Sequence, residues 1–488
     1  MLPESSFRVW PWACVRAAGF AANRILALGA PEVGRFIEEV LDAGIGQTFS
    51  DLNHENRRML TAAHEAANLR ISQEIRAVAR DPRFREAITW QNRRAIHTAI
   101  DILTRKPIEG GNKKVRQKER LVASYLQRYC VKNDTIGFFG PVCWARVTDA
   151  NEPLRINVDE RFLSRREVYF EQWCIDAIAA QLAMTEEFRE WAPPRLQPYV
   201  RFVANSVHLP FIGLFEVSQA QMAVLTACDG ATPGRVIAQR IGSRWAQSGM
   251  SEQDVLDFLA RADAMRIVVW DFSVAMQLHP ERALRGKIAQ IPDFALRARA
   301  MAPLDELENA RARVAAAAGD DKALDRALDD FEGTFQRLTA QAPTRADGRV
   351  YAARTLLYED THRAADVVIG ASLLRKLGPP LSLLLASARW FTHQAAIRFQ
   401  QNLDTIYDRL LPTSGVAVDL AVFHKAFIDS EPFLSNRGST PSPILSAVQA
   451  ELQARWAELL PLPNDARRVQ FYSSALRSRV LEAFPAMR

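Results

Sequence analysis

Apolar residues recur at three- and four-residue steps through most of this 488-residue chain, and this spacing constrains the fold more than any other feature. The longest such pattern covers residues 381–411, where Leu384, Phe391, Phe399 and Ile406 keep helical spacing. Shorter patterns of the same kind cover residues 50–80, 84–103, 113–129, 171–183 and 303–340. The sequence therefore predicts a predominantly helical protein.

Short runs rich in β-branched and aromatic residues interrupt the helices, at 137–147, 154–158, 199–217 and 267–272. Such runs are typical of short strands. After the run at 199–217, Ser218 with Gln221 and Ser251 with Asp254 have the spacing of a capping box, and Pro233 is expected at a first helical position. Strands followed by three short helices predict a small winged-helix-like module.

Together these patterns predict an α+β fold that is predominantly helical and multi-lobed, with short antiparallel sheets and an embedded winged-helix-like module. The proline-containing segment 191–198 indicates a linker. We expect residues 1–195 to form a lobe of helices and strands, 196–275 the module, and 276–488 a mostly helical part.

Cysteine usage and charge narrow the class of protein. The five cysteines lie far apart without a C-x-x-C pair, which favours a reducing cytoplasm over a disulfide framework or a thiolate zinc site. The N-terminus lacks the apolar region of a signal peptide, and the most apolar run, 377–390, is too short to span a bilayer. We expect a cytoplasmic protein without membrane contact. The net charge of +6 permits a polyanionic partner but does not require one.

Common motifs for metals and nucleotides are missing from the sequence. The segment HEAAN (64–68) has Asn68 where a zinc-binding helix needs a second histidine. Gly44-Ile45-Gly46 lacks the third glycine of a dinucleotide-binding turn, and no phosphate loop or G-x-S-x-G motif occurs. We therefore expect no metal and no bound cofactor.

Cations and acids gather instead in four stretches, 12–23, 90–97, 128–141 and 356–370. Arg128 and Lys132 are four residues apart, so one helical face presents both. Gly137 and Gly140 allow backbone to approach an anionic partner closely. In the fourth stretch, a strand would direct Glu359 and Thr361 to one side and Asp360 and His362 to the other. Carboxylates placed there could orient an amine or help to transfer a proton. Taken alone, these residues fit an anion site or ordinary caps and surface ion pairs.

Four segments of the sequence, taken in order, are similar to those of a known protein family. RAAGF (16–20), WQNRRAIHTA (90–99), YLQRYCVKNDTIGFFGPV (125–142) and YEDTHRAADVVIG (358–370) resemble the N-terminal domain of the lantibiotic dehydratases, from near residue 7 to the C-terminus. The resemblance implies an aminoacyl-tRNA co-substrate, glutamyl-tRNA in the best-known branch. Its acyl group is donated to Ser or Thr hydroxyls of a ribosomally made precursor peptide. Related members without an elimination domain append an amino acid to the C-terminus of a carrier peptide.

By this resemblance the catalytic positions are Arg16, Arg128, Lys132, Asp134, Glu359 and Asp360. Lys132 stands where many members have arginine. A compact ammonium charge therefore replaces a guanidinium group that could donate two parallel hydrogen bonds. Asp134-Thr135 replaces the commoner threonine-proline. Cations bind the phosphates of an acceptor arm, which makes the following residues candidates for tRNA binding: Arg93, Arg94, Lys113, Lys114, Arg116, Lys118 and Arg120.

Residues 228–239 resemble the winged-helix element that binds leader peptides in peptide-modifying enzymes. Such modules add the leader as a strand at a sheet edge and lodge its apolar side chains against the third helix. The resemblance implies peptide contacts from Leu209, Phe211, Leu214, Val255, Phe258 and Leu259. A DNA-binding winged helix is the alternative, but Asp254, Asp257 and Asp263 on the third helix disfavour it.

Full-length members of this family continue beyond the equivalent of Arg488. The resemblance therefore predicts three partners: aminoacyl-tRNA, the leader of the precursor peptide, and a second polypeptide that completes the domain. A homodimer is also compatible with the sequence. Three functions stay open: the tRNA-dependent half of a split peptide-modifying enzyme, an aminoacyl-tRNA-dependent peptide extender, or a non-catalytic leader-binding subunit or truncated product.

Overall fold

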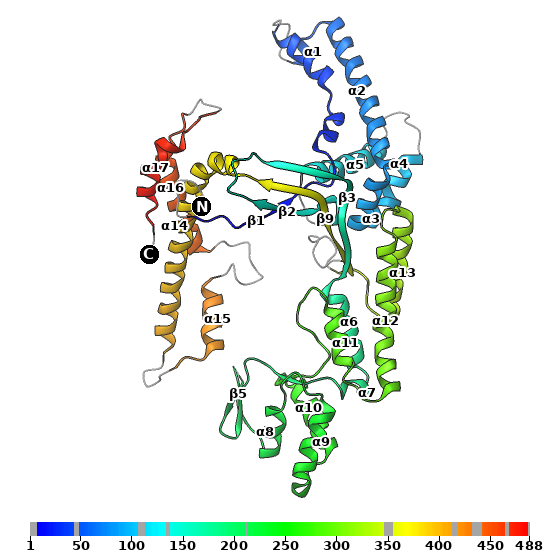
Figure 1. Cartoon of the computed structure of the whole chain (residues 1–488), viewed down its shortest axis with the longest axis vertical. Coiled ribbons are helices and arrows are strands. Elements are labelled where there is room, and N and C mark those ends of the chain that lie inside the picture. The colour runs from blue at the N-terminus through cyan, green and yellow to red at the C-terminus, as the bar shows by residue number, and fades with distance from the viewer. Residues whose placement is uncertain are drawn as a thin grey trace.

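A computed structural model describes residues 7–42, 48–105, 113–132, 137–210, 212–345, 355–411, 417–431, 442–463 and 468–486. Helices predominate, and a four-stranded sheet lies between the helical lobes (Figure 1). The predicted α+β fold with a mostly helical, multi-lobed architecture is therefore confirmed.

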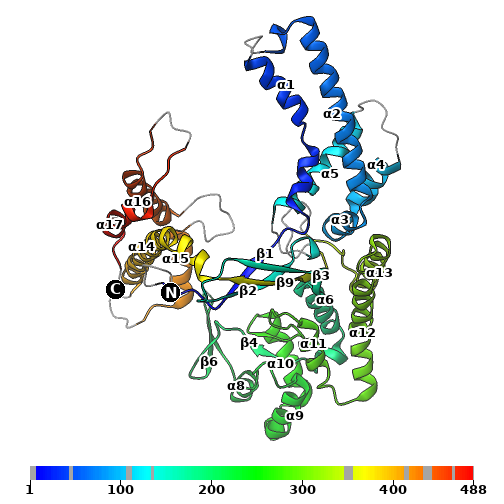
Figure 2. The same ribbon diagram turned by 45° about the horizontal axis from the view of Figure 1, so that its top comes forward.

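The N-terminal lobe is helical. Its elements are a 3-10 turn (Ala22–Leu28), α1 (Pro31–Asp42), a 3-10 turn (Phe49–Asp51), α2 (His54–Arg80), α3 (Pro82–Ala95), a π turn (Ile96–Ile100), α4 (Asp101–Arg105) and α5 (Lys113–Val131). The hairpin of α1 and α2 projects away from the rest of the molecule (Figure 2). The single helix predicted at 84–103 is broken, because Asn92 has non-helical backbone angles (φ −157°, ψ 73°) and a π turn follows.

The central sheet has the order β1 (Trp12–Arg16), β2 (Val142–Val147), β9 (Leu357–Ile369), β3 (Arg155–Phe170). It differs from the predicted short antiparallel sheets, because β2 and β9 run parallel and β3 is 16 residues long. The strand predicted to begin at 137 begins at Val142, since Gly137–Phe139 form a 3-10 turn.

The middle region combines short strands and short helices. Its elements are α6 (Gln172–Ala183), α7 (Glu186–Arg189), β4 (Arg195–Leu196), β5 (Arg201–Val203), β6 (Ser206–Leu209), β7 (Gly213–Glu216), α8 (Gln219–Thr226), α9 (Gly234–Trp245), a 3-10 turn (Ala246–Ser248), α10 (Glu252–Ala264) and β8 (Val268–Val269). Both predicted capping boxes are present. Pro233, however, precedes the first helical residue of α9, and the strand predicted at 267–272 is reduced to β8, which pairs with β4 from the expected linker.

Buried apolar residues of the middle region belong to a larger core. That core also contains side chains of α11 (Pro280–Ile288), α12 (Phe294–Ala316) and α13 (Asp321–Thr339). The predicted boundaries at residues 195 and 275 therefore do not coincide with a break in the core, and the division into domains stays a prediction.

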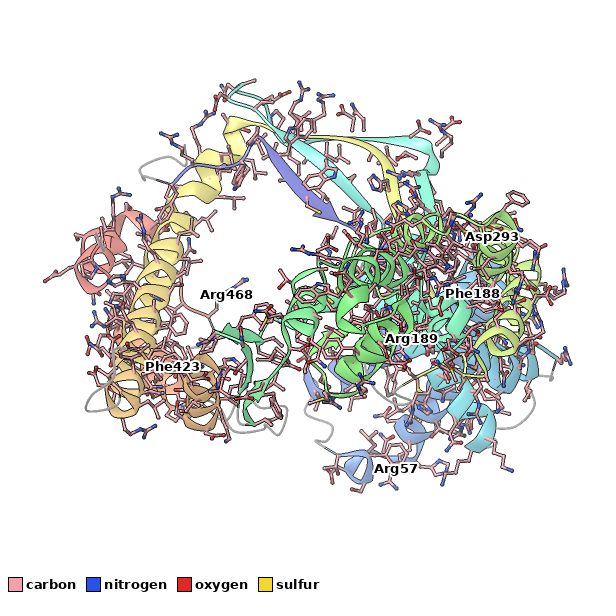
Figure 3. The ribbon with its side chains drawn as sticks, turned by 90° about the horizontal axis from the view of Figure 1, so that it is seen from below. Arg57, Phe188, Arg189, Asp293, Phe423 and Arg468 are labelled. Atoms are coloured by element: carbon pink, nitrogen blue, oxygen red, sulfur yellow. The ribbon has the colours of Figure 1, made fainter. Side chains whose placement is uncertain are left out.

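The C-terminal lobe has a core of its own, built around Trp390, Val448 and Phe484. It contains α14 (Ala371–Leu410), α15 (Leu420–Ser430), α16 (Pro443–Leu459) and α17 (Ser473–Ala483). The helix predicted to begin at 381 begins at Ala371 and includes Pro379 and Pro380. Figure 3 shows Phe423 of α15 on the opposite side of the molecule from Arg189 of α7. None of the described helices combines the length and apolar character needed to cross a membrane.

Candidate functional site

A groove of about 430 Å³ opens at the C-terminal end of α5. Both predicted cations, Arg128 and Lys132, line it, together with four other residues of the same helix end: Ser124, Tyr125, Gln127 and Val131. The Lys132 N–H donates to the Arg128 carbonyl oxygen at 2.9 Å, which continues the helical turn through Lys132. Arg128 and Lys132 therefore present their side chains one turn apart along the groove.

A track of cations leads along α5 toward this groove. At 100° per residue, Lys113, Arg116 and Arg120 project from the same side of the helix as Ser124 and Val131. These three cations are exposed, and a helix of 19 residues is about 28 Å long. Of the other predicted cations, Lys114 is exposed on the neighbouring side, while Lys118 donates to the Thr98 carbonyl oxygen at 3.1 Å.

The buried ring of Tyr129 joins three of the predicted stretches behind the groove. Its centroid lies 5.8 Å from that of Phe20 and 4.8 Å from that of Phe139. Its hydroxyl donates to Gln91 Oε1 at 2.5 Å. Segments 16–20, 90–97 and 128–141 therefore meet around one aromatic side chain of α5.

Backbone contacts place Arg16 beside the segment that leaves the groove. The Gly19 N–H donates to the Phe139 carbonyl oxygen at 2.7 Å, and a Cβ on Gly19 would lie 2.1 Å from the Phe139 Cα atom. A glycine is required for this approach. Arg16 ends β1 opposite Val142 of β2 and is exposed.

The fourth predicted stretch supports the turn after the groove. Glu359 Oε2 accepts the Phe138 N–H at 3.2 Å, and the Thr361 hydroxyl donates to the Gly137 carbonyl oxygen at 2.8 Å. Gly137 has a φ of +57°, and a Cβ there would lie 2.8 Å from Glu359 Oε2. The predicted alternation along β9 is confirmed, because Glu359 and Thr361 are buried whereas Asp360 is exposed.

The two acids predicted as catalytic therefore occupy different environments. Glu359 is 1% exposed and pairs with Arg166, which also pairs with the buried Glu86. Burial raises the pKa of Glu359 to about 7. The negative charge of Glu86 also raises this pKa, whereas the positive charge of Arg166 lowers it. In this structure Glu359 positions the turn and does not face solvent. Asp360 is accessible, with a pKa raised by partial burial, but it faces the side of β9 away from the turn.

Arg93 differs from the cations of α5 because acids already surround it. Its guanidinium lies 3.3 Å from Asp325, 2.8 Å from Asp329 and 3.2 Å from Glu332, all on α13. Three carboxylates neutralise its charge, which argues against the predicted contact with phosphates. Arg94 is exposed.

The residues predicted to contact the peptide also differ in how far their side chains are buried. Leu209, Val255 and Leu259 lie in the core and Phe258 is 8% exposed, so these side chains do not face a peptide in this conformation. Leu214 on β7 is 60% exposed. Phe211 and the catalytic candidate Asp134 lie outside the described residues.

Three arginines that the sequence did not single out as a group surround Phe20 and Phe162. The Arg83 guanidinium lies 5.5 Å from the Phe20 centroid and 4.2 Å from that of Phe162. Arg24 lies 5.3 Å from Phe20, and Arg363 lies 4.4 Å from Phe162. Burial and the neighbouring cations lower the pKa of Arg83. No sequence pattern links these positions, although Arg363 falls within the fourth stretch.

No group of three or more His, Cys, Asp or Glu side chains able to hold a metal ion occurs among the residues that the structure describes.

Comparison with known proteins gives the following relationships. The family model for the lantibiotic dehydratase N terminus matches residues 80–412. The structure of the TbtB glutamylation domain from thiomuracin biosynthesis is similar, with 15% identity and a TM-score of 0.60 over 96% of this chain and 65% of that chain. The same domain bound to 5'-phosphodesmethylglutamycin has 15% identity and a TM-score of 0.58 with the same coverage.

The tRNA-dependent lantibiotic dehydratase MibB from Microbispora sp. 107891 has 13% identity and a TM-score of 0.51, over 86% of this chain and 39% of that chain. This chain thus spans less than two thirds of the length of each of these structures. No curated protein sequence matches it. At such identities the structural likeness concerns the fold.

Proposed function

The chain belongs to the lantibiotic dehydratase N-terminal family, and from this we propose that it transfers an amino acid, glutamate, from aminoacyl-tRNA to Ser or Thr of a ribosomally made precursor peptide. The observation that carries the proposal is the track of Lys113, Arg116 and Arg120, which leads along α5 to Arg128 and Lys132. Phosphates of a tRNA acceptor arm bind mainly to such cations.

The proposed reaction is a transesterification. The peptide hydroxyl oxygen attacks the carbonyl carbon of the aminoacyl ester, and the bond from that carbon to the ribose oxygen breaks. The hydroxyl proton passes to the ribose oxygen, so the products are an acylated peptide and uncharged tRNA. Arg128, Lys132 and Arg16 would hold the anionic end of the tRNA, and Glu359 would position the turn beside it.

Leader binding and a second polypeptide are further parts of the proposal. The three-stranded sheet β5–β6–β7 ends in β7, and an extended leader can add to such an edge by backbone hydrogen bonds. Leu214 of β7, which is 60% exposed, would contact the leader. The proposal also includes a second polypeptide that acts together with this chain.

Reconstitution tests the proposal. The chain is incubated with its precursor peptide, the partner polypeptide and tRNA charged with radiolabelled glutamate. We expect label on the peptide as a base-labile ester. Arg128→Ala should lower affinity for charged tRNA about 10- to 100-fold, because a charged hydrogen bond is lost, and should abolish transfer while leader binding is kept. Arg244→Ala, at an exposed position of α9 outside the groove, should change neither.

Two results would contradict this function. Absence of label in every combination, with tRNA binding intact, would leave the chain without transfer activity. Base-stable label at the C-terminus of the peptide would indicate the peptide extender instead.

A further inference from the structure

Three arginines from separate elements gather around the rings of Phe20 and Phe162. Arg24 belongs to the 3-10 turn before α1, Arg83 to the first turn of α3, and Arg363 to β9. The Arg83 guanidinium lies over both rings, whereas those of Arg24 and Arg363 each lie over one of them. Arg83 is therefore the common neighbour, and the side chains of Arg24, Arg83 and Arg363 form what we name the arginine cluster.

The local structure of β3 and α3 brings the cluster together. The register of β3 against β9 shifts between Val158 and Leu163, and Phe162 lies in this irregular part of the strand. Such irregularities redirect side chains, and Phe162 packs against the core of the N-terminal lobe. The Arg83 N–H donates to Asp81, the N-cap of α3, at 2.9 Å. The cluster is thus built where the N-terminal lobe meets the central sheet.

Acidic side chains leave most of the charge of the cluster unpaired. Asp81 lies 2.9 Å from Nη2 of Arg24, but no described carboxylate forms an ion pair with Arg83 or Arg363. Each of these two arginines makes one hydrogen bond within the described part of the chain, to a backbone carbonyl oxygen. Their remaining N–H groups have no acceptor there.

Two other acids near the cluster are already engaged. Glu86 pairs with Arg166 and also accepts the N–H of Gly319. Asp159 pairs with Arg161 of the same strand. Neither carboxylate is therefore free to balance the cluster.

The three cations also act on one another. Burial is the main cause that lowers the pKa of Arg83, and the charges of Arg24 and Arg363 lower it further, against the opposite effect of Asp81. Like charges held this close repel each other. An anion that joined the cluster would remove this repulsion.

Solvent reaches all three side chains. Arg24 is 36% exposed, Arg83 is exposed and Arg363 is half-buried. The Nε and Nη2 atoms of Arg363, which have no partner among the described residues, are not sealed from solvent. A ligand from solution can therefore meet the free donors directly.

The geometry favours a phosphate group over a carboxylate. Arg83 and Arg363 lie 4.2 and 4.4 Å from the centroid of the same ring, that of Phe162. Their guanidinium carbons can be no farther apart than the sum of these distances, a span that one phosphate can bridge with two of its oxygens. A phosphate monoester offers three acceptor oxygens and up to two negative charges, whereas a carboxylate offers two oxygens and one charge.

We propose that the arginine cluster binds a phosphate group. Arg83 and Arg363 would each donate to it through the fork of a guanidinium, and Arg24 would add its charge. None of these residues lines the groove on α5, so this is a separate site. The proposal does not rest on the transfer activity proposed above. Both an RNA backbone and a small phosphorylated compound present such a group.

Equilibrium dialysis against radiolabelled inorganic phosphate tests this. We expect the wild-type chain to retain phosphate. Arg83→Gln and Arg363→Gln should each lower its affinity about 10- to 100-fold, because a charged hydrogen bond is lost. Arg83→Lys keeps the charge without the fork, so its affinity should lie between those of Arg83→Gln and the wild type.

The double variant Arg297→Gln/Arg299→Gln is the matched control for Arg83→Gln/Arg363→Gln. It also removes two arginines that lie over aromatic rings, but on α12 and outside the cluster. Its phosphate retention should equal that of the wild type. Phosphate, compared with chloride at equal ionic strength, should raise the melting temperature of the wild type and the control but not that of Arg83→Gln/Arg363→Gln.

Three results would overturn the proposal. They are a wild type that retains no phosphate, equal retention by both double variants, and a melting temperature of Arg83→Gln/Arg363→Gln that is lowered by the same amount in both salts. The last would assign Arg83 and Arg363 a purely structural role.

An unlabelled RNA hairpin ending in CCA, added to the dialysis, separates the two sources of phosphate. Displacement of the label would assign the cluster to a phosphate of the RNA backbone, and unchanged retention would assign it to a small phosphorylated compound. Phosphate retention without glutamate transfer would contradict the proposed function alone, and transfer without retention would contradict the phosphate site alone.

Discussion

At the scale of single residues, burial separates side chains that look equivalent in the sequence. Glu359 and Asp360 are neighbours of the same charge type, yet Glu359 is enclosed with Arg166 and Glu86 while Asp360 faces solvent. Gly19 similarly differs from Gly286, because the Phe139 backbone occupies the space of its missing Cβ whereas no atom lies near that of Gly286. Each difference has a measurable consequence.

The raised pKa of Glu359 makes stability depend on pH. Between its ordinary value of 4.5 and its folded value of about 7, the folded protein keeps a proton that the unfolded chain has released. The free energy of unfolding should therefore fall as the pH rises through this window, by at most about 3 kcal/mol from this group. Glu359→Gln cannot ionise and should lack this part of the decline.

Urea unfolding at several pH values from 4.5 to 8 measures this difference. Glu160→Gln, at an exposed position of β3, is the control and should follow the wild type. Curves for Glu359→Gln and wild type that stay parallel would show that Glu359 is ionised throughout.

Gly19→Ala should destabilise the protein by about 1–3 kcal/mol, because the new methyl group overlaps the Phe139 backbone. It should also weaken tRNA binding, since Gly19 fixes the turn behind the groove. Gly286→Ala on α11 is the matched control: no atom lies within 4 Å of its added Cβ, so helix propensity should make it neutral or stabilising by up to about 1 kcal/mol. Equal urea midpoints for the two variants would contradict the close packing.

At the scale of elements, α5 and α3 show how helices with adjacent cations take different roles. The cations of α5 lie along an open face that ends in a groove. Arg93 of α3 instead faces α13 and is held by its acids. The position of a neighbouring helix therefore decides which cations can meet a phosphate.

The double variant Arg116→Gln/Arg120→Gln should reduce the salt dependence of tRNA binding. Each phosphate contact contributes about 0.7–0.9 to the slope of log K against log salt, so the slope should become shallower by about 1.5. Filter binding between 50 and 200 mM salt measures it. Arg240→Gln/Arg244→Gln removes the same charge from exposed positions of α9 and should leave the slope unchanged. Equal slopes for both double variants would argue against a track on α5.

At the scale of the whole molecule, the apolar cores define its parts better than the order of elements does. One core joins the middle region and α11–α13, another holds the N-terminal helices, and a third belongs to the C-terminal lobe. In the third core, Trp390 packs against Phe484 with ring centroids 5.6 Å apart. A lobe with a core of its own can open without the rest.

Trp390→Ala should therefore destabilise the C-terminal lobe alone, by about 3–5 kcal/mol. Hydrogen–deuterium exchange should rise in α14, α16 and α17 and stay unchanged in α6 and α12. A matching rise in all of these helices would show instead that the lobe unfolds together with the larger core.

The sequence by itself determined the features that depend on neighbouring residues. Helical spacing predicts a helix over 113–129, and α5 covers 113–131. Both capping boxes form, and the residues of β9 alternate between buried and exposed. These features arise from interactions within a few residues, which periodicity and cap chemistry describe. The ordered motifs also indicated the family, because their spacing is a property of the chain.

Only the tertiary structure decided which of these residues can meet a ligand. The contacts of Arg93 with α13, of Glu359 with Arg166 and of Gly19 with Phe139 join residues far apart in the chain. The same holds for the parallel pairing of β2 with β9 and for the burial of Val255 and Leu259. Such pairings depend on how whole elements pack, and no local pattern records them. The side chains of Arg128 and Lys132 line a groove at that end of α5.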